Sequence, residues 1–136
     1  MIAILDSGPL YAVVDPDDRA HERSRATIQS PDLNIVIPTM VVAEVTYFVG
    51  QRLGPGIESA FLMGLSEFIV EAPSPEDWPR IAELVRRYAN FPLGGTDASV
   101  VALAERLNTD LVITLDRRHF AAIRPRHCPA FRLLPD

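Results

Sequence analysis

The sequence predicts an α/β domain in which a parallel sheet is covered by helices on both faces. Two observations carry this prediction: short β-favouring runs alternate with helical segments, and the chain of 136 residues is long enough to bury one core. No internal repeat or low-complexity tail interrupts the alternation. We therefore expect residues 1–136 to form a single domain with right-handed crossovers between its strands.

The predicted elements follow from local apolar patterns. The strands are IAIL (2–5), NIVI (34–37), FIVE (68–71), DLVITL (110–115) and, as a fifth candidate, AFRLL (130–134). The helices are predicted over 9–14, 17–29, 40–53, 56–66, 76–89 and 97–107. Thr39 and Gly54 suit the two caps of the third helix, and Thr96 suits the N-cap of the last.

The stretch MVVAEVTYFV (40–49) contains one carboxylate, Glu44, within residues that suggest a helix buried on every side. A glutamate is rarely buried without a partner, because an isolated charge in a low-dielectric interior is costly. We therefore expect the head group of Glu44 to reach a positive charge. An arginine would satisfy it, and so would a metal ion.

Composition narrows the class of function. The net charge of −5 argues against a nonspecific nucleic-acid coat, and no apolar run approaches the ~20 residues of a bilayer span. The start MIAILDSGPL lacks a basic leader region, and the lone Cys128 cannot form an internal disulfide. We expect a soluble protein of the reducing cytoplasm with no membrane partner.

The basic residues are all arginines, the side chain best suited to gripping a phosphate. Arg117 and Arg118 are the candidates for contacts to phosphate groups, in a cluster that also includes Arg124 and Arg126. The alternative for this cluster is a solvated loop, or contacts to the chain's own carboxylates.

Four acids are predicted to meet at one edge of the sheet. Asp6 and Asp116 each follow a strand directly, so they lie at the carboxyl ends where ligands of such sheets bind. Glu44 lies one turn into a helix that follows a strand, and its side chain leans back toward that edge. Asp97 begins the helix that leads down to the strand at 110, so it lies at the same edge.

Each acid alone has a simpler explanation: Asp97 as a capping residue, Asp6 as a turn residue, and Asp116 as a surface ion pair. Together the four carboxylates would repel one another and become protonated unless a cation lay between them. Oxygen ligands without Cys or His favour Mg²⁺ or Mn²⁺. Such a site hydrolyses phosphodiesters with a metal-activated water, and one or two ions would serve.

These residues resemble the motifs of the PIN domain family, and within it the VapC-type toxins of bacterial toxin–antitoxin pairs. The resemblance spans nearly the whole chain. Its four motifs occur in order as ILDSGPL, PTMVVAEVTY, GGTDASVVALAERL and DLVITLDRRHF. It implies a three-layer α/β/α fold with a five-stranded parallel sheet, and metal-dependent endoribonuclease activity.

The resemblance also assigns roles to residues. It places the acidic set on Asp6, Glu44, Asp97 and Asp116, and it gives the hydroxyls of Ser7, Thr96 and Thr114 the task of orienting ligands or metal-bound water. It implies a cognate antitoxin whose tail covers the active site, and a homodimer. The apolar residues of the helices at 40–53 and 56–66 would form such interfaces, or else belong to the core: Tyr47, Phe48, Phe61, Leu62 and Met63.

Two other functions stay open at this stage. One is a non-catalytic PIN-fold module that binds RNA or a partner, which the complete set of four acids argues against. The other is a receiver-type phosphotransfer domain, which would expect a late lysine that this chain lacks. His119 suggests a structural or solvated residue, with an acid–base role as the alternative. Phe120 is expected to bury the loop that holds Asp116.

Overall fold

The computed structural model describes residues 1–136 and contains one sheet of five parallel strands. All five predicted strands are confirmed, with slightly different bounds. They are β1 (Ile2–Leu5), β2 (Asn34–Pro38), β3 (Ile69–Glu71), β4 (Leu111–Ile113) and β5 (Arg132–Leu134). Their order across the sheet is β3-β2-β1-β4-β5, so β1 lies at the centre.

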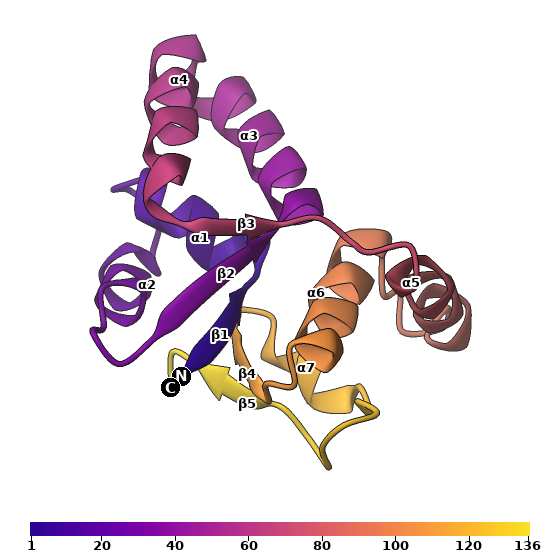
Figure 1. Ribbon diagram of the computed structural model, residues 1–136. Coiled ribbons are helices and arrows are strands. Elements are labelled where there is room, and N and C mark those ends of the chain that lie inside the picture. The colour runs from indigo at the N-terminus through magenta and orange to yellow at the C-terminus, as the bar shows by residue number, and fades with distance from the viewer.

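Helices cover both faces of this sheet, as Figure 1 shows. They are α1 (Ser7–Val14), α2 (His21–Ile28), α3 (Thr39–Leu53), α4 (Pro55–Gly64), α5 (Asp77–Arg87), α6 (Gly95–Arg106) and α7 (Arg117–Ala122), with a 3₁₀ turn η1 (Leu65–Glu67). Right-handed crossovers place α1 to α4 on one face and α5 to α7 on the other. The predicted three-layer α/β/α fold is therefore confirmed. No helix is both long and apolar enough to cross a bilayer.

The chain changes direction next to β1. The first two crossovers lead from β1 outward to β2 and β3, and the third returns across the sheet to β4, on the other side of β1. Such a reversal opens a crevice at the carboxyl ends of the two central strands. Helix α6 packs against β1, β2 and β4 and is buried from Ala98 through Ala104, so its N-terminus is fixed at this crevice.

Helix α3 is less buried than its sequence predicts. Only Val41, Val45 and Val49 are fully buried, one residue per turn along a single stripe, whereas Tyr47 is 61% exposed. Glu44 is partly exposed rather than enclosed. The expectation of burial on every side was therefore wrong, because an apolar composition alone does not show which helical faces meet a neighbour.

Several element ends also differ from prediction. Pro38 and Gly94, not Thr39 and Thr96, occupy the N-cap positions of α3 and α6, and neither helix has a side-chain cap. Gly54 does end α3, with a φ of 91° that suits glycine. The helix predicted from residue 17 begins only at His21, because Asp15 and Asp18 accept backbone hydrogen bonds from residues 17 and 20 and hold that segment in turns.

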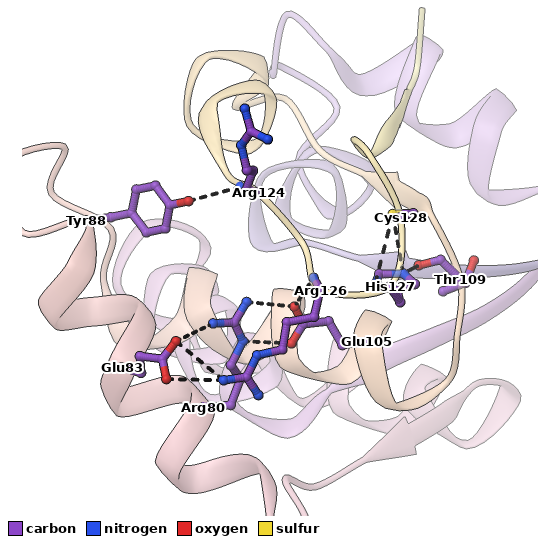
Figure 2. A network of polar contacts seen from close by, with 9 residues as sticks. All are labelled: Arg80, Glu83, Tyr88, Glu105, Thr109, Arg124, Arg126, His127 and Cys128. Atoms are coloured by element: carbon purple, nitrogen blue, oxygen red, sulfur yellow. Dashed lines mark hydrogen bonds and ion pairs between the residues drawn. The ribbon is translucent and has the colours of Figure 1, made fainter.

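A polar network connects the segment after α7 to helices α5 and α6, as Figure 2 shows. Arg80 of α5 donates two hydrogen bonds of 2.8 Å to Glu105 of α6 and one of 2.7 Å to Glu83. Arg126 donates its backbone N–H to Glu105 at 2.8 Å and pairs with Glu83. The backbone N–H of Arg124 donates to the hydroxyl of Tyr88. These contacts anchor the chain between α7 and β5.

Candidate active site

Asp6 is the most deeply buried of the four predicted acids. It follows β1 at the N-cap of α1, is 5% exposed, and donates its backbone N–H to the carbonyl of Ile113 at the end of β4. Its Oδ2 accepts a hydrogen bond of 2.8 Å from Thr114, but its Oδ1 is buried with no partner. Burial, and to a lesser degree the charges of Asp97 and Glu44, raise the pKa of Asp6 to about 7.

Asp97 and Glu44 complete the acidic group around Asp6. Asp97 lies in the first turn of α6, where burial raises its pKa and the charges of Asp116 and Glu44 raise it further. The charges of Asp97 and Glu44 act on Asp6, and those of Asp116 and Glu44 act on Asp97. No three of these side chains are close enough to form a metal-binding group, so their convergence on one ion stays a prediction.

Thr114 connects two of these acids. It is 1% exposed at the end of β4, donates to Asp6 Oδ2, and accepts the backbone N–H of Asp116 at 2.9 Å. One hydroxyl therefore fixes the carboxylate of Asp6 and the chain turn that carries Asp116. The family resemblance predicted only a supporting role for Thr114, and these contacts give that role a physical basis.

Asp116 is held by its own helix. Helix α7 is an element that was not predicted; Asp116 is its N-cap and accepts the backbone N–H of His119 at 3.1 Å. The ring Nδ1 of His119 lies 2.5 Å from Asp116 Oδ2, and the ring packs edge-on against Phe91 at 4.9 Å between centroids. His119 therefore positions Asp116. Phe120 is fully buried, as expected, and anchors the same turn.

The other predicted hydroxyls differ in their surroundings. Ser7 opens α1 beside Asp6, and its Oγ is buried without a hydrogen-bond partner. Thr96 lies in the first turn of α6, where its carbonyl accepts a hydrogen bond of 2.6 Å from Ser99. The hydroxyl of Thr96 bonds to none of the four acids, in contrast to that of Thr114.

The donor set fits a hard divalent cation. Two buried oxygen atoms, Asp6 Oδ1 and Ser7 Oγ, lack partners, and burial together with neighbouring acids raises the pKa values of Asp6 and Asp97, an effect that a bound positive charge would oppose. No three acidic, histidine or cysteine side chains are gathered into a ready-made ligand cage. An ion here would keep part of its water shell, as Mg²⁺ commonly does.

The arginine cluster after Asp116 is only partly available for phosphate. Arg117 donates to the carbonyls of Leu133 and Pro135, and Arg126 pairs with Glu83, so these two contact the chain itself. Arg118 is exposed, and its guanidinium carbon lies 5.4 Å from the ring centroid of Phe91. The structure thus favours Arg118 over Arg117 as a phosphate contact.

Known proteins resemble this chain in sequence and in fold. The family model of the PIN domain matches residues 3–124. Ribonuclease VapC26 of Mycobacterium tuberculosis is 34% identical over 134 residues, which cover 97% of this chain and 99% of that protein.

Two solved structures share this fold. The chain superposes on Mycobacterium tuberculosis VapC20, described as a Sarcin-Ricin loop cleaving toxin, with a TM-score of 0.71 at 16% identity, over 81% of this chain and 86% of that one. It also superposes on VapBC2 from Rickettsia felis bound to a promoter DNA fragment, with a TM-score of 0.71 at 19% identity, over 98% and 97% of the two chains. At these identities the superpositions establish the fold.

Proposed function

The chain belongs to the PIN domain family, and from this premise we propose that it is a metal-dependent endoribonuclease, the toxin of a type II toxin–antitoxin pair. Its substrate is RNA, and the bond that it hydrolyses is a phosphodiester. The observation that carries the proposal is the Asp6 carboxylate, which is buried with one oxygen unpartnered beside other acids. The ribonuclease relative at 34% identity supports the same activity.

Asp6, Glu44, Asp97 and Asp116 would hold Mg²⁺ or Mn²⁺. When bound, such an ion supplies Lewis-acid catalysis and lowers the pKa of the attacking water. Thr114 keeps the carboxylate of Asp6 in one orientation, and His119 does the same for Asp116. Ser7 offers a buried hydroxyl with free hydrogen-bonding capacity next to Asp6.

The protein would act in the cytoplasm and would be controlled by a partner. The solved relatives include toxin–antitoxin complexes, one from Klebsiella pneumoniae and a DNA-bound VapBC from Salmonella typhimurium. We infer a cognate antitoxin whose tail covers the acidic edge, by which we mean the end of the sheet that carries Asp6, Glu44, Asp97 and Asp116. We also infer a homodimer of the toxin. The exposed apolar residues of α3 and α4 suit such interfaces: Tyr47, Leu62 and Met63. Phe61 is buried and belongs to the core.

The strand order argues against the receiver-type alternative. Receiver domains have the order 2-1-3-4-5, whereas this sheet has β3-β2-β1-β4-β5. The chain also lacks lysine. The remaining alternative is a non-catalytic module of the same fold, which would bind RNA without cutting it.

Incubation of the purified protein with mixed single-stranded RNA tests the proposal. Cleavage should require Mg²⁺ or Mn²⁺, stop with EDTA, and leave a hydrolysed phosphodiester. RNA that is bound but never cut under any divalent metal would favour the non-catalytic module and contradict the proposal. Co-expression with the neighbouring reading frame tests the partner, because an antitoxin should co-purify and suppress cleavage.

A further inference from the structure

A cavity of about 240 Å³ opens beside the acidic edge, between α1 and α3. Ser7 and Glu44 line its end next to the candidate metal ligands, and Tyr11, Phe48 and Arg52 line the rest. It therefore continues the site toward the β2 side of the sheet. Tyr11, Phe48 and Arg52 have no role in the proposed metal site.

Arg52 is held in this cavity by aromatic rings rather than by acids. Its guanidinium carbon lies 4.7 Å from the ring centroid of Phe48 and 5.1 Å from that of Tyr11. No carboxylate oxygen lies within 4.0 Å of its nitrogens, so it forms no ion pair. Contacts to ring faces fix the plane of a guanidinium. Arg52 is exposed and also interacts with the hydroxyl of Tyr11, which leaves its other N–H donors directed at solvent.

Two acids beside this cavity, Asp15 and Asp18, already have other partners. Asp15 accepts the hydroxyl of Tyr11 at 2.8 Å and the backbone N–H of Asp17 at 3.0 Å. Asp18, which lines the cavity, accepts the backbone N–H of Ala20 at 2.8 Å. Arg52 is thus a positive group whose donors have no anion within the chain.

The helix places Arg52 in line with the acidic edge. Glu44, Phe48 and Arg52 are spaced four residues apart, which puts them on one stripe of α3. Eight residues of helix span about 12 Å, and the arginine side chain leans back toward Glu44. An anion bound by Arg52 would therefore lie close to, but not at, the carboxylates.

We propose that this cavity is a substrate subsite in which Arg52 binds a backbone phosphate of single-stranded RNA, next to the phosphate that is cut. A planar guanidinium fork matches phosphate geometry, and aromatic walls suit an unstacked base. Arg118, packed on Phe91, lies on the other side of β1. Two aromatic-supported arginines would then flank the acids along one RNA path. This inference rests on the proposed ribonuclease function.

RNA binding at several salt concentrations tests the subsite without cleavage. The full chain carrying Asp97→Asn is titrated with a fluorescent single-stranded RNA, with and without a second change at Arg52. Arg52→Gln should weaken binding several-fold and reduce the slope of log affinity against log salt by about 0.7, the value for one phosphate on a single strand. Arg52→Lys should keep the slope but bind more weakly, because the stacked fork is lost.

Arg23→Gln is the matched control, since Arg23 is an exposed arginine on α2 without an ion pair. Phe48→Leu removes one aromatic wall and should reproduce part of the Arg52 effect. Urea midpoints confirm that each variant folds. An Arg52→Gln protein with the affinity and slope of the Arg23→Gln control would overturn the subsite.

Other outcomes separate the subsite from the nuclease proposal. If the parent cuts RNA and Arg52→Gln cuts and binds equally well, the subsite is wrong and the nuclease stands. If the parent never cuts RNA but Arg52→Gln lowers the salt slope by the amount expected for one phosphate contact, the subsite stands and the nuclease proposal fails. If Arg52→Gln impairs only capture of the antitoxin, the cavity receives a protein carboxylate and the RNA proposal is overturned.

Discussion

Two regions of this molecule bury carboxylates, and they treat the charge in opposite ways. Between α5 and α6, the Glu105 side chain is 11% exposed, and Arg80 and Arg126 hydrogen-bond to it. Burial would raise the pKa of Glu105, but these hydrogen bonds outweigh it and hold the pKa below its ordinary value. At the sheet edge, Asp6 is more deeply buried than Glu105, has one side-chain partner in the hydroxyl of Thr114 and no cation, and has a pKa that burial raises to about 7.

The difference shows where the chain itself neutralises its buried charges and where it does not. The Arg80 network is closed, since each buried charge has its counter-charge within the chain. The Asp6 edge is open, because burial and neighbouring acids raise the pKa values of Asp6 and Asp97 and one buried oxygen atom of Asp6 has no partner. A structural role predicts the first pattern and a metal site predicts the second.

Neutralising an acid at the open edge should have the largest effect on activity. Asp6→Asn and Asp97→Asn each remove a negative ligand while keeping the side-chain shape, so RNA cleavage should fall by orders of magnitude. Folding should persist, because repulsion among the acids is relieved. Initial cleavage rates with circular dichroism as the folding control measure this. Parent-like cleavage by either variant would remove that acid from the proposed metal site.

Breaking the closed network should cost stability instead. Arg80→Ala leaves the partly buried Glu105 with only the backbone hydrogen bond from Arg126, and the loss of its bidentate partner should cost about 1–3 kcal/mol. Urea denaturation gives the change in unfolding free energy. The double variant Arg80→Met, Glu105→Leu should recover much of the loss, and exposed Arg23→Ala should change little. A loss below about 1 kcal/mol for Arg80→Ala would show that the network is dispensable.

The pH dependence of stability should single out the open edge. Since the pKa of Asp6 is about 7 in the folded chain and ordinarily 3.8, the metal-free folded state holds a proton that the unfolded chain has lost between these values. Its unfolding free energy should therefore fall as pH rises from about 4 to 7, by up to roughly 4 kcal/mol from this group.

Urea denaturation in EDTA at pH 5 and pH 8 measures that loss. The Asp6→Asn variant should lack this contribution, and Mg²⁺ at pH 8 should restore stability to the parent alone. Identical pH profiles for parent and variant would mean that Asp6 has an ordinary pKa and that ionising it costs no folding stability.

His119 should have the smallest of these effects. It holds Asp116 from beside the site, and loss of such a supporting contact typically weakens metal binding about 10- to 100-fold. His119→Ala should raise the Mn²⁺ concentration needed for half-maximal cleavage. His119→Asn, whose amide can replace Nδ1 as a donor, should restore most of it. If His119→Ala and His119→Asn both need the same Mn²⁺ concentration as the parent, His119 does not position Asp116.

The sequence predicted the fold well because its signal is local. Alternating apolar runs identified all five strands, and the positions of Asp6 and Asp116 at strand ends placed them at the ligand-binding edge. The sequence-based prediction was wrong where contacts between distant segments determine which residues are buried. The faces of α3 that stay exposed depend on which neighbours meet it, so Tyr47 could not be placed, and α7 is too short for a periodic pattern.

The same limit applies to the site. Residue type marked the acids, but the contacts that orient them join distant segments, as the hydrogen bond from Thr114 to Asp6 does over 108 residues. Arg52 gave no signal in the sequence, because its environment is made by Tyr11 on another helix. Arg117 was chosen by its nearness to Asp116 in the chain, whereas its guanidinium turns to the carbonyls of the C-terminal segment.

The central claim is that the acids at the carboxyl end of the sheet are built to hold a divalent cation. Isothermal titration of Mn²⁺ into the metal-free protein, without RNA, tests it most directly. The parent should bind Mn²⁺ with release of protons at pH 7, and Asp6→Asn should bind at least about tenfold more weakly. A parent that takes up no Mn²⁺, or an Asp6→Asn protein that binds it equally well, would contradict the claim.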